Sequence, residues 1–410
     1  MPQASTRSGV QLHLTMMAAL LAMVGPFTID TYLPSFPDIE ATFHVERAIL
    51  VQSLGVYLAA FAVSTLFWGP LADRIGRRHV VIISSTLFVL ASIGCAWADS
   101  MEHLLLLRLL QGLAASGGLI AGRAMIRDAH DAPTAQKAMA QVMLMFALAP
   151  AIAPILGGWL QEMWGWRSVF WFLALFGLLI LFFTLFTQET LGKDERQSIQ
   201  PRFVLNTYMR TLRHAQFPAL VLSLSFIFAG LFLYIAGAPT LIYDFLGLGA
   251  QDFSIQFVPM VSGMLIGSVL AGRMAHRWSA SHTIRIGFTL MATAVGINVL
   301  QSSLLPATPF FMIAPLALYA LGLALLMPTL TILALDCFPH HRGTAASMQG
   351  FLQMVASALV ASVAVPLLHS ERFYFAMGQA LFLCLAIALW WHVQHLVHTK
   401  QEGGEHGHVD

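Results

Sequence analysis

Long apolar stretches separated by short polar segments run along almost the whole chain. Twelve of these stretches come close to the roughly 20 residues that an α-helix needs to cross a bilayer. The pattern therefore predicts an all-α membrane protein with twelve transmembrane helices. We expect them at residues 12–35, 48–70, 79–98, 103–125, 137–160, 168–187, 218–243, 253–274, 282–302, 309–335, 345–368 and 374–396.

The longest polar stretch, residues 188–217, lies between the sixth and seventh apolar stretches and divides them six and six. Connections elsewhere are short, as expected for helices that pack as antiparallel neighbours. The predicted parts of the chain are a cytoplasmic N-terminus (1–11), a first six-helix half (12–187), a cytoplasmic central loop (188–217), a second six-helix half (218–396) and a cytoplasmic tail (397–410).

Composition agrees with a membrane protein, because 58% of the 410 residues are hydrophobic and only 10% are charged. Soluble domains carry about a quarter charged residues. The net charge of +1 gives no reason to expect a nucleic-acid partner. The three cysteines are widely spaced, so we interpret them as buried small hydrophobes and predict neither a disulfide nor a metal site. The first apolar stretch is too long for a signal-peptide core and is read as a retained span.

The distribution of basic residues predicts the orientation of the chain. With the N-terminus inside, all but four of the 21 lysines and arginines fall on the cytoplasmic side. Arg47, Arg167 and Arg372 fall outside, and Arg108 lies within a span. The positive-inside rule therefore places both termini and the central loop in the cytoplasm, in a multi-pass protein of the inner membrane.

The loop after the second span reads Gly-Pro-Leu-Ala-Asp-Arg-Ile-Gly-Arg-Arg over residues 69–78. We expect Gly69 to let a neighbouring helix approach closely and Asp73 to face a helix N-terminus, for which the start of span 11 near Arg342 is a candidate. We expect Gly76 to end the helix. Arg74 and the arginines that follow Gly76 should hold the loop in the cytosol. A degraded copy at residues 267–277 is typical of an internal repeat, which supports two related halves.

The inner end of span 4 places two further arginines and an acid beside this loop. Arg123 and Arg127 are four residues apart and share a helix face, and Asp128 follows them. We expect a charge network of Asp73, Arg77, Arg127 and Asp128. Ordinary arginines that extend toward the headgroups are the alternative explanation.

Asp30 and Arg108 are charged residues inside predicted spans 1 and 4. A carboxylate within a span costs about 2.5–3.5 kcal/mol on insertion scales, so Asp30 should face a cavity or a partner. Both residues lie about 8–9 Å below the outer surface, at 1.5 Å per helical residue, and are therefore candidates for a proton-coupling pair. The alternatives are a headgroup-level position for Asp30 and a purely structural ion pair.

Span 5 contains Pro150 and Pro154, followed by Gly157 and Gly158. Each proline deletes a backbone hydrogen bond, and small residues at three- and four-residue spacing allow close helix contact. Such a segment can bend and slide, which favours a gate between the halves. A kinked but static packing helix is the alternative.

Several polar and aromatic residues are candidates for an amphipathic substrate cavity. They are Tyr32, Tyr57, Phe61, Gln111, Phe146, Tyr234 and Tyr319. Any one of them could instead face lipid or the packed interior. His340, His341, His392, His395 and His398 lack partner carboxylates or cysteines, so we expect an interfacial position and no metal site.

No nucleotide-binding or catalytic motif occurs in a suitable context, so the protein is predicted to be neither an enzyme nor dependent on a cofactor. If the protein moves a solute across the membrane, the absence of an ATP-binding motif means that the energy must come from an ion gradient or from the solute itself. A membrane sensor would require an added soluble domain, and none is present in the sequence.

The loop at residues 69–78 resembles the signature loop of the major facilitator superfamily, and the sequence from Thr28 to Pro37 is similar to the opening of its Bcr/CflA-type drug exporters. Arg127-Asp128, Trp166-Arg167 and Glu189-Thr190-Leu191 are similar to that group as well. Residues 108–112 match a span 4 pattern associated with proton coupling, and residues 149–158 resemble an antiporter motif, although Ala149 replaces the glycine of many relatives.

The resemblance implies that Asp30 handles substrate and protons. We therefore expect a monomeric, proton-coupled exporter of small amphipathic compounds or drugs, working in the lipid bilayer by rocking of its two halves. A metabolite transporter of the same fold, for nucleosides, amino acids or sugars, is the alternative.

Overall fold

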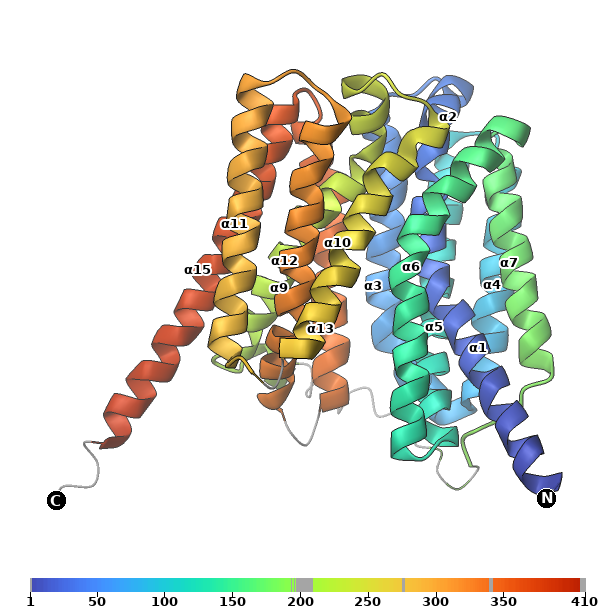
Figure 1. Ribbon diagram of the computed structural model, residues 1–410. Helices are drawn as coiled ribbons and strands as arrows, with labels where there is room; N and C mark the ends of the chain where they lie inside the picture. Colours follow the sequence, from blue (N-terminus) through green and yellow to red (C-terminus); the bar gives the residue numbers. More distant parts are fainter. Residues whose placement is uncertain are drawn as a thin grey trace.

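The structure is a computed structural model that describes residues 2–192, 194, 196, 209–274, 277–338 and 342–405. Within these residues, twelve helices are long and apolar enough to cross a membrane, which confirms the number predicted from the apolar pattern. They form two groups of six that stand side by side (Figure 1). His340, His341 and, within the predicted central loop, residues 193, 195 and 197–208 lie outside the described residues.

The first half contains seven α-helices and one short 3₁₀ helix. Their bounds are α1 (Pro2–Asp30), η1 (Leu33–Ser35), α2 (Phe36–Phe43), α3 (Arg47–Ile75), α4 (Arg77–Ala96), α5 (Met101–Ala129), α6 (Ala132–Trp164) and α7 (Arg167–Leu185). The first membrane span combines α1, η1 and α2, because the chain turns after Asp30 and resumes a helix at Phe36. The sequence predicted its end at residue 35.

The described residues of the second half form six long helices and four short ones. Their bounds are α9 (Phe217–Ala236), η3 (Thr240–Phe245), η4 (Ala250–Asp252), α10 (Phe253–Met274), α11 (Ala280–Leu304), α12 (Pro309–Asp336), α13 (Arg342–Leu359), η5 (Val360–Ala364), α14 (Val365–Leu368) and α15 (Arg372–Glu405). The seventh span begins with α9, which ends at Ala236, earlier than the predicted residue 243, because Gly237 and Pro239 interrupt it before the π-helical turn η3.

The N-terminal end of α1 and the C-terminal end of α15 lie on one face of the molecule (Figure 1). We call it the terminal face, and it carries the ends of α1 and α15 and the turn between α3 and α4. The opposite face carries the turn after α1, η3, η4 and the loop between α11 and α12. Helices α1 and α15 extend to residues 2 and 405, into the ranges predicted to be polar terminal segments.

Corresponding helix pairs in the two halves approach each other through glycine. A methyl group added at Gly112 of α5 would lie 2.2 Å from the Tyr57 carbonyl oxygen of α3. At Gly263 of α10, it would lie 2.2 Å from the Ala317 carbonyl oxygen of α12. Spans 2 and 4 thus pack like spans 8 and 10, as expected for halves related by an internal repeat.

The cysteines do not share one environment, which corrects the prediction that all three are buried. Cys95 is buried in α4, Cys337 is partly exposed after α12, and Cys384 is exposed on α15. A membrane-spanning helix presents apolar side chains to lipid as well as to its neighbours, so an apolar position in the sequence does not distinguish the two.

Candidate functional site

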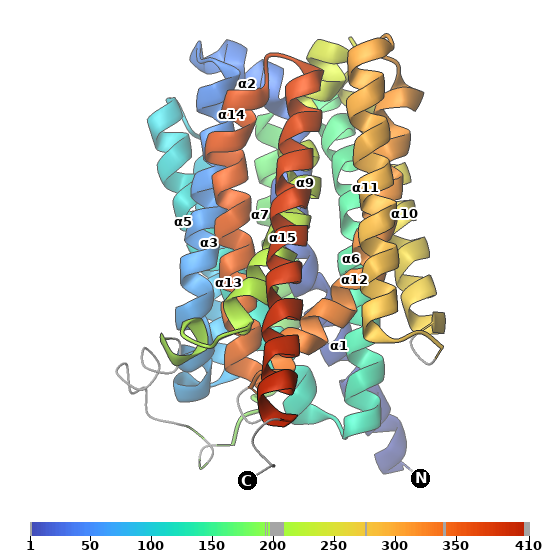
Figure 2. The same cartoon turned by 90° about the vertical axis from the view of Figure 1, so that its left-hand side faces the viewer.

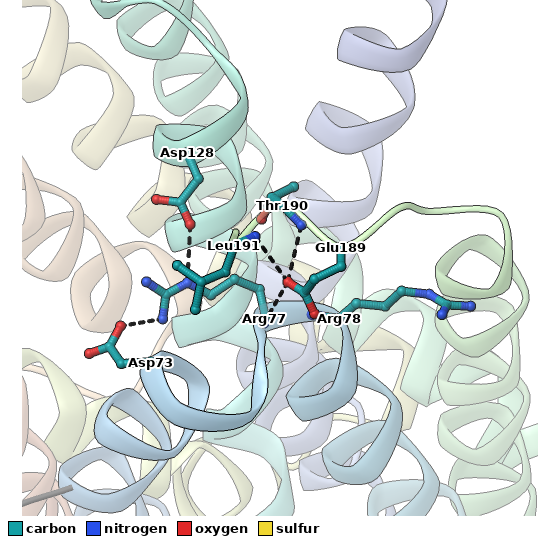
Figure 3. Close-up of polar contacts among 7 residues, drawn as sticks. All are labelled: Asp73, Arg77, Arg78, Asp128, Glu189, Thr190 and Leu191. Atoms are coloured by element: carbon teal, nitrogen blue, oxygen red, sulfur yellow. Dashed lines mark hydrogen bonds and ion pairs between the residues drawn. The ribbon is translucent and has the colours of Figure 1, made fainter. Parts of the chain in front are cut away.

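Arg77 connects two acids at the terminal face (Figure 3). Its Nε donates to Asp128 Oδ2 at 3.1 Å, and its Nη1 forms an ion pair with Asp73. The side chain of Arg77 is only 7% exposed, so the two carboxylates balance a largely buried charge. The structure therefore brings together three of the four residues expected in this network.

The fourth residue, Arg127, is exposed and makes no hydrogen bond or ion pair with another described residue, and the same holds for Arg74. Asp73 was expected to face the N-terminus of span 11. In this conformation it contacts Arg77 of its own half, and no described hydrogen bond joins it to α13.

Glu189, which follows α7, occupies the N-terminus of α4 (Figure 3). Its carboxylate accepts from the backbone N–H groups of Arg77 at 2.9 Å and Arg78 at 3.2 Å. It also accepts from the N–H groups of Thr190 and Leu191, at 3.0 and 3.1 Å. A carboxylate at this position satisfies helix donors that have no intrahelical partner and is attracted by the helix dipole.

Gly76 makes this contact possible. Its φ of +106° is a conformation that favours glycine, and a methyl group on it would lie 2.3 Å from Glu189 Oε2. The sequence indicated that Gly76 breaks the chain but did not reveal the role of Glu189. Because Glu189 lies more than 100 residues from Arg77, no local spacing could have indicated the contact.

Arg108 is completely buried in α5. Its Nη1 donates to Gln111 Oε1 at 2.7 Å and to the Thr28 carbonyl oxygen at 3.2 Å. The guanidinium carbon lies 4.8 Å from the ring centre of Tyr32 and 4.6 Å from that of Tyr57. Cation–π contacts at a desolvated site contribute about 2 kcal/mol. Nε and Nη2 of Arg108 have no hydrogen-bond partner among the described residues.

Asp30 is the last residue of α1 and is 3% exposed. Within the described part of the chain, no hydrogen bond or ion pair joins it to Arg108. Arg108 instead reaches α1 at Thr28, and residues two positions apart on a helix do not face the same side. The two residues expected to pair are therefore both buried in the first half but do not form an ion pair in this conformation.

Six of the seven candidates for the substrate cavity lie inside the halves. Tyr32, Tyr57, Gln111 and Tyr319 are fully buried, and Phe61 and Tyr234 nearly so. Phe146 of α6 packs on a small cluster that includes Val142. Their exposure to a substrate path therefore stays a prediction.

Tyr234 belongs to a polar cluster that sequence reasoning did not single out. The Nδ2 of Asn298 in α11 donates to Tyr234 OH at 2.6 Å and to Gln379 Oε1 at 2.9 Å. All three side chains are buried. The only sequence signal was an isolated amide within an apolar stretch at each of two positions, Asn298 and Gln379.

The two consecutive glycines of α6 contact different partners. A methyl group on Gly157 would lie 2.2 Å from the carbonyl oxygen of Thr31, in the same half. At Gly158 it would lie 2.3 Å from the carbonyl oxygen of Ala250 in η4, which belongs to the other half. Helix α6 remains continuous through Pro150 and Pro154. The predicted gate segment thus lies at the junction of the two halves.

Four side-chain hydrogen bonds connect the halves among the described residues, and all lie toward the opposite face. The pairs are Arg47–Asp244, Gln52–Ser362, Tyr243–Pro34 and Gln251–Glu162. Arg47 also pairs with Glu40 of its own half, at 2.7 Å. Burial raises the pKa of Tyr243, so its hydroxyl remains a donor to the Pro34 carbonyl oxygen at 2.6 Å.

Helices of the two halves also lie together toward this face. Helix α3 packs on α13 and η5, and α3 and α13 stand side by side in Figure 2. Helix α6 packs on α10 and η4, whereas the helix ends of the two halves diverge toward the terminal face (Figure 1). A methyl group on Gly69, near the terminal face, would meet nothing within 4 Å. The close approach predicted for Gly69 is therefore not made in this conformation, in which the described side-chain hydrogen bonds between the halves all lie toward the opposite face.

Two six-helix halves joined at one face define a polytopic membrane transporter. A sequence model described as "Major Facilitator Superfamily" matches residues 18–361, and the chain belongs to this superfamily. Its resemblance to Bcr/CflA-type drug exporters is supported by the names of its relatives.

Three relatives illustrate the similarity. The uncharacterized MFS-type transporter YdgK of Bacillus subtilis (strain 168) is 30% identical, over 92% of this chain and 94% of the relative. Multidrug resistance protein D of Escherichia coli (strain K12) is 28% identical, over 92% and 95%. The bicyclomycin resistance protein homolog of Haemophilus influenzae (strain ATCC 51907 / DSM 11121 / KW20 / Rd) is 25% identical, over 84% and 86%.

Among solved structures, the fold is similar to that of a bacterial homolog of the human lysosomal transporter Spinster, in an inward-facing and unoccupied conformation. The TM-score is 0.74 at 15% sequence identity, and the alignment covers 95% of this chain and 97% of the other. At this identity the likeness concerns the fold alone.

Proposed function

We propose that this protein exports small amphipathic compounds, including drugs, across the inner membrane in exchange for protons. Membership of the major facilitator superfamily and relatives named for multidrug and bicyclomycin resistance support the proposal. The two halves, residues 12–187 and 218–396, would move as units about the contacts described above. The protein would act as a monomer and without enzymatic activity.

The terminal face would be cytoplasmic. Arg74, Arg77, Arg78 and Arg127 lie toward it, whereas among the described basic residues only Arg47, Arg167 and Arg372 lie toward the opposite face, in keeping with the positive-inside rule. The conformation described here would then be inward-facing, with the path for substrate open to the cytoplasm and closed to the outside.

Asp30 would carry the transported proton. A buried charge is costly unless it is paired, and Asp30 has no basic partner among the described residues, so the protonated form would be preferred in this conformation. Arg108, with two unpartnered nitrogens in the same half, would stabilise the ionised carboxylate after a rearrangement of α1. Exchange between these arrangements would couple proton release to the movement of the halves.

The energetics are adequate for such an exchange. Expelling a neutral compound against a hundredfold gradient costs about 2.7 kcal/mol. One proton entering across about 150 mV supplies about 3.4 kcal/mol before any contribution from a pH difference.

The observation that carries this proposal is a buried carboxylate without a basic partner in a transporter closed at one face. The test uses inverted membrane vesicles with an acidic interior and a fluorescent pH probe. Addition of a transported drug should release protons from vesicles that contain the wild-type protein, and Asp30→Asn should abolish the release while the protein remains in the membrane. Unchanged proton release in Asp30→Asn would show that the proton site lies elsewhere.

A further inference from the structure

An apolar cavity of about 580 Å³ lies between α11 and α12, near their ends at the opposite face. Its volume is within the range of about 300–1,000 Å³ that is typical of small-molecule sites. We call it the α11–α12 cavity. Its wall includes Ile297, Leu300, Leu304, Phe310, Ala314 and Leu318.

The cavity faces away from the first half. Every residue that lines it belongs to α11, α12 or the loop between them. Leu300, Leu304 and Phe310 are 62%, 77% and 74% exposed. Helix α11 lies on the side of the molecule remote from the first half (Figure 1). In a membrane, these side chains meet the hydrocarbon of the bilayer.

The depth of the cavity corresponds to one leaflet. The lining residues extend from the helix ends to Ile297 on α11 and Leu318 on α12. At 1.5 Å per residue, these positions lie about 10–14 Å from the helix ends. Half of the hydrocarbon core of a bilayer is about 15 Å thick. An acyl chain of the leaflet at the opposite face would therefore lie along the cavity.

A basic group, which lines the smaller neighbouring cavity, adjoins the α11–α12 cavity at the end where a lipid headgroup would be. Nη2 of Arg372 donates to the carbonyl oxygen of Leu305, which lines the cavity. This is the only hydrogen bond of Arg372 within the described residues, and no described carboxylate pairs with it, although Glu371 precedes it in the chain. Arg47, at the same face, is by contrast paired with Glu40 and Asp244.

Gln301 separates the cavity from the polar interior of the second half. Its Nε2 donates to the carbonyl oxygen of Phe311, and both residues line the cavity. A second, much smaller cavity containing Tyr234 and Asn298 lies behind them. The larger cavity is therefore open to hydrocarbon and closed toward the buried amide cluster, which favours a resident lipid over a compound in transit.

We propose that the α11–α12 cavity binds one acyl chain of a phospholipid whose phosphate contacts Arg372, with a preference for an anionic headgroup. The planar guanidinium matches the geometry of a phosphate group. A zwitterionic headgroup carries its own cation, which competes with Arg372 for the phosphate. One arginine near a membrane surface corresponds to about a fivefold preference for the anionic lipid. The inference concerns the fold and does not depend on the proposed export.

The test titrates the delipidated, full-length protein with phosphatidylglycerol or phosphatidylethanolamine and counts bound lipids by native mass spectrometry. The wild-type protein should retain one lipid more tightly than all others, with phosphatidylglycerol preferred about fivefold. Ala314→Trp fills the cavity and should remove this tight binding for both lipids. Arg372→Gln should keep the tight binding and lose the headgroup preference.

Two matched controls carry the same changes elsewhere. Leu178→Trp adds bulk to the exposed surface of α7, and Arg167→Gln removes another arginine of the opposite face. Both should bind lipid like the wild-type protein. If Ala314→Trp does not fold, Leu300→Trp fills the cavity from α11. Unchanged tight binding in a folded cavity variant, or displacement of the bound molecule by a drug but not by lipid, would overturn the proposal.

Discussion

Gly158 of α6 lies so close to Ala250 of η4 that a methyl group on the glycine would come within 2.3 Å of the Ala250 carbonyl oxygen. This backbone contact joins the two halves at the opposite face. A larger side chain at Gly158 would push the halves apart there. Because the contact exists only while that face is closed, Gly158 should control the balance between the two conformations of the transporter.

Gly158→Leu should therefore favour the outward-facing form. Overpacking costs about 1–3 kcal/mol, which corresponds to a shift of about tenfold in the equilibrium between the forms. Spin labels on Lys137 of α6 and His282 of α11, both exposed at the terminal face, would report the change as a shorter distance. An unchanged distance distribution in the folded variant would contradict the role of this contact.

Gly69→Leu should have the reverse effect. A side chain at Gly69 meets nothing within 4 Å in the present conformation, so the substitution costs little here. When the terminal face closes, the added side chain would obstruct the other half. We expect the same pair of labels to remain at the long distance and transport to fall, with substrate affinity retained. Restored transport in the double variant that carries Gly69→Leu and Gly158→Leu would show that the two substitutions shift the equilibrium between the forms in opposite directions.

Glu189→Ala should destabilise the first half. The carboxylate accepts four backbone hydrogen bonds and caps α4, and loss of a helix cap costs about 1–2 kcal/mol. Glu189→Gln keeps an acceptor and should cost less. Thermal unfolding of the purified variants measures the difference. Equal melting temperatures for the alanine and glutamine variants would show that the cap contributes nothing.

Gly76→Ala should act on the same contact, since its methyl group would displace Glu189 Oε2. Combined with Glu189→Ala, it should therefore cost less than the sum of the two separate losses. The remaining cost reflects the backbone conformation at Gly76. Full additivity of the two losses in melting temperature would mean that the glycine and the carboxylate act independently.

Tyr243→Phe should weaken closure of the opposite face by about 1 kcal/mol, or about fivefold, because it removes the hydrogen bond to Pro34. Burial raises the pKa of Tyr243 above its ordinary value, so the contribution of the phenol is fully present below the ordinary tyrosine pKa of about 10 and is lost as the pH rises from there through the raised value. The difference between variant and wild type should therefore be equal at about pH 6 and about pH 9. A difference that vanishes by about pH 9 would indicate an ionised phenol.

Neutral or weakly charged amphipathic compounds should be exported better than dications. Asp244 and Asp336 are paired with Arg47 and Arg342, which leaves Asp30 as the buried acid without a basic partner in the described helices. A dication would lack a second counter-charge in a low-dielectric site. Efflux of matched neutral, monocationic and dicationic compounds measures the preference, and a preference for dications would contradict it.

The same comparison has an electrical readout. Exchange of a neutral compound for one proton moves net charge, whereas exchange of a monocation does not. Collapse of the membrane potential with valinomycin and potassium, at a constant pH gradient, should therefore slow efflux of the neutral compound only. Equal sensitivity of both compounds would exclude a one-for-one exchange.

The twelve spans could be predicted from sequence because bilayer thickness imposes a minimum length on each apolar stretch. Contacts between residues far apart in the sequence could not be predicted from it. Arg108 was expected to meet Asp30 because their depths agree, yet it reaches Thr28 and Gln111, since depth does not determine the direction in which a side chain points around its helix. The Glu189 contact joins segments more than 100 residues apart and leaves no periodic signal.

The contacts of Gly157 and Gly158 imply that neighbouring positions should tolerate variation differently. Gly157 adjoins Thr31 within one half and would stay in contact through every turnover, so a larger residue there would lower the yield of folded protein. Gly158 adjoins the other half and would separate from it once per cycle. A library screened for expression alone would deplete substitutions at residue 157 and retain those at residue 158, and only selection by drug survival would remove the latter.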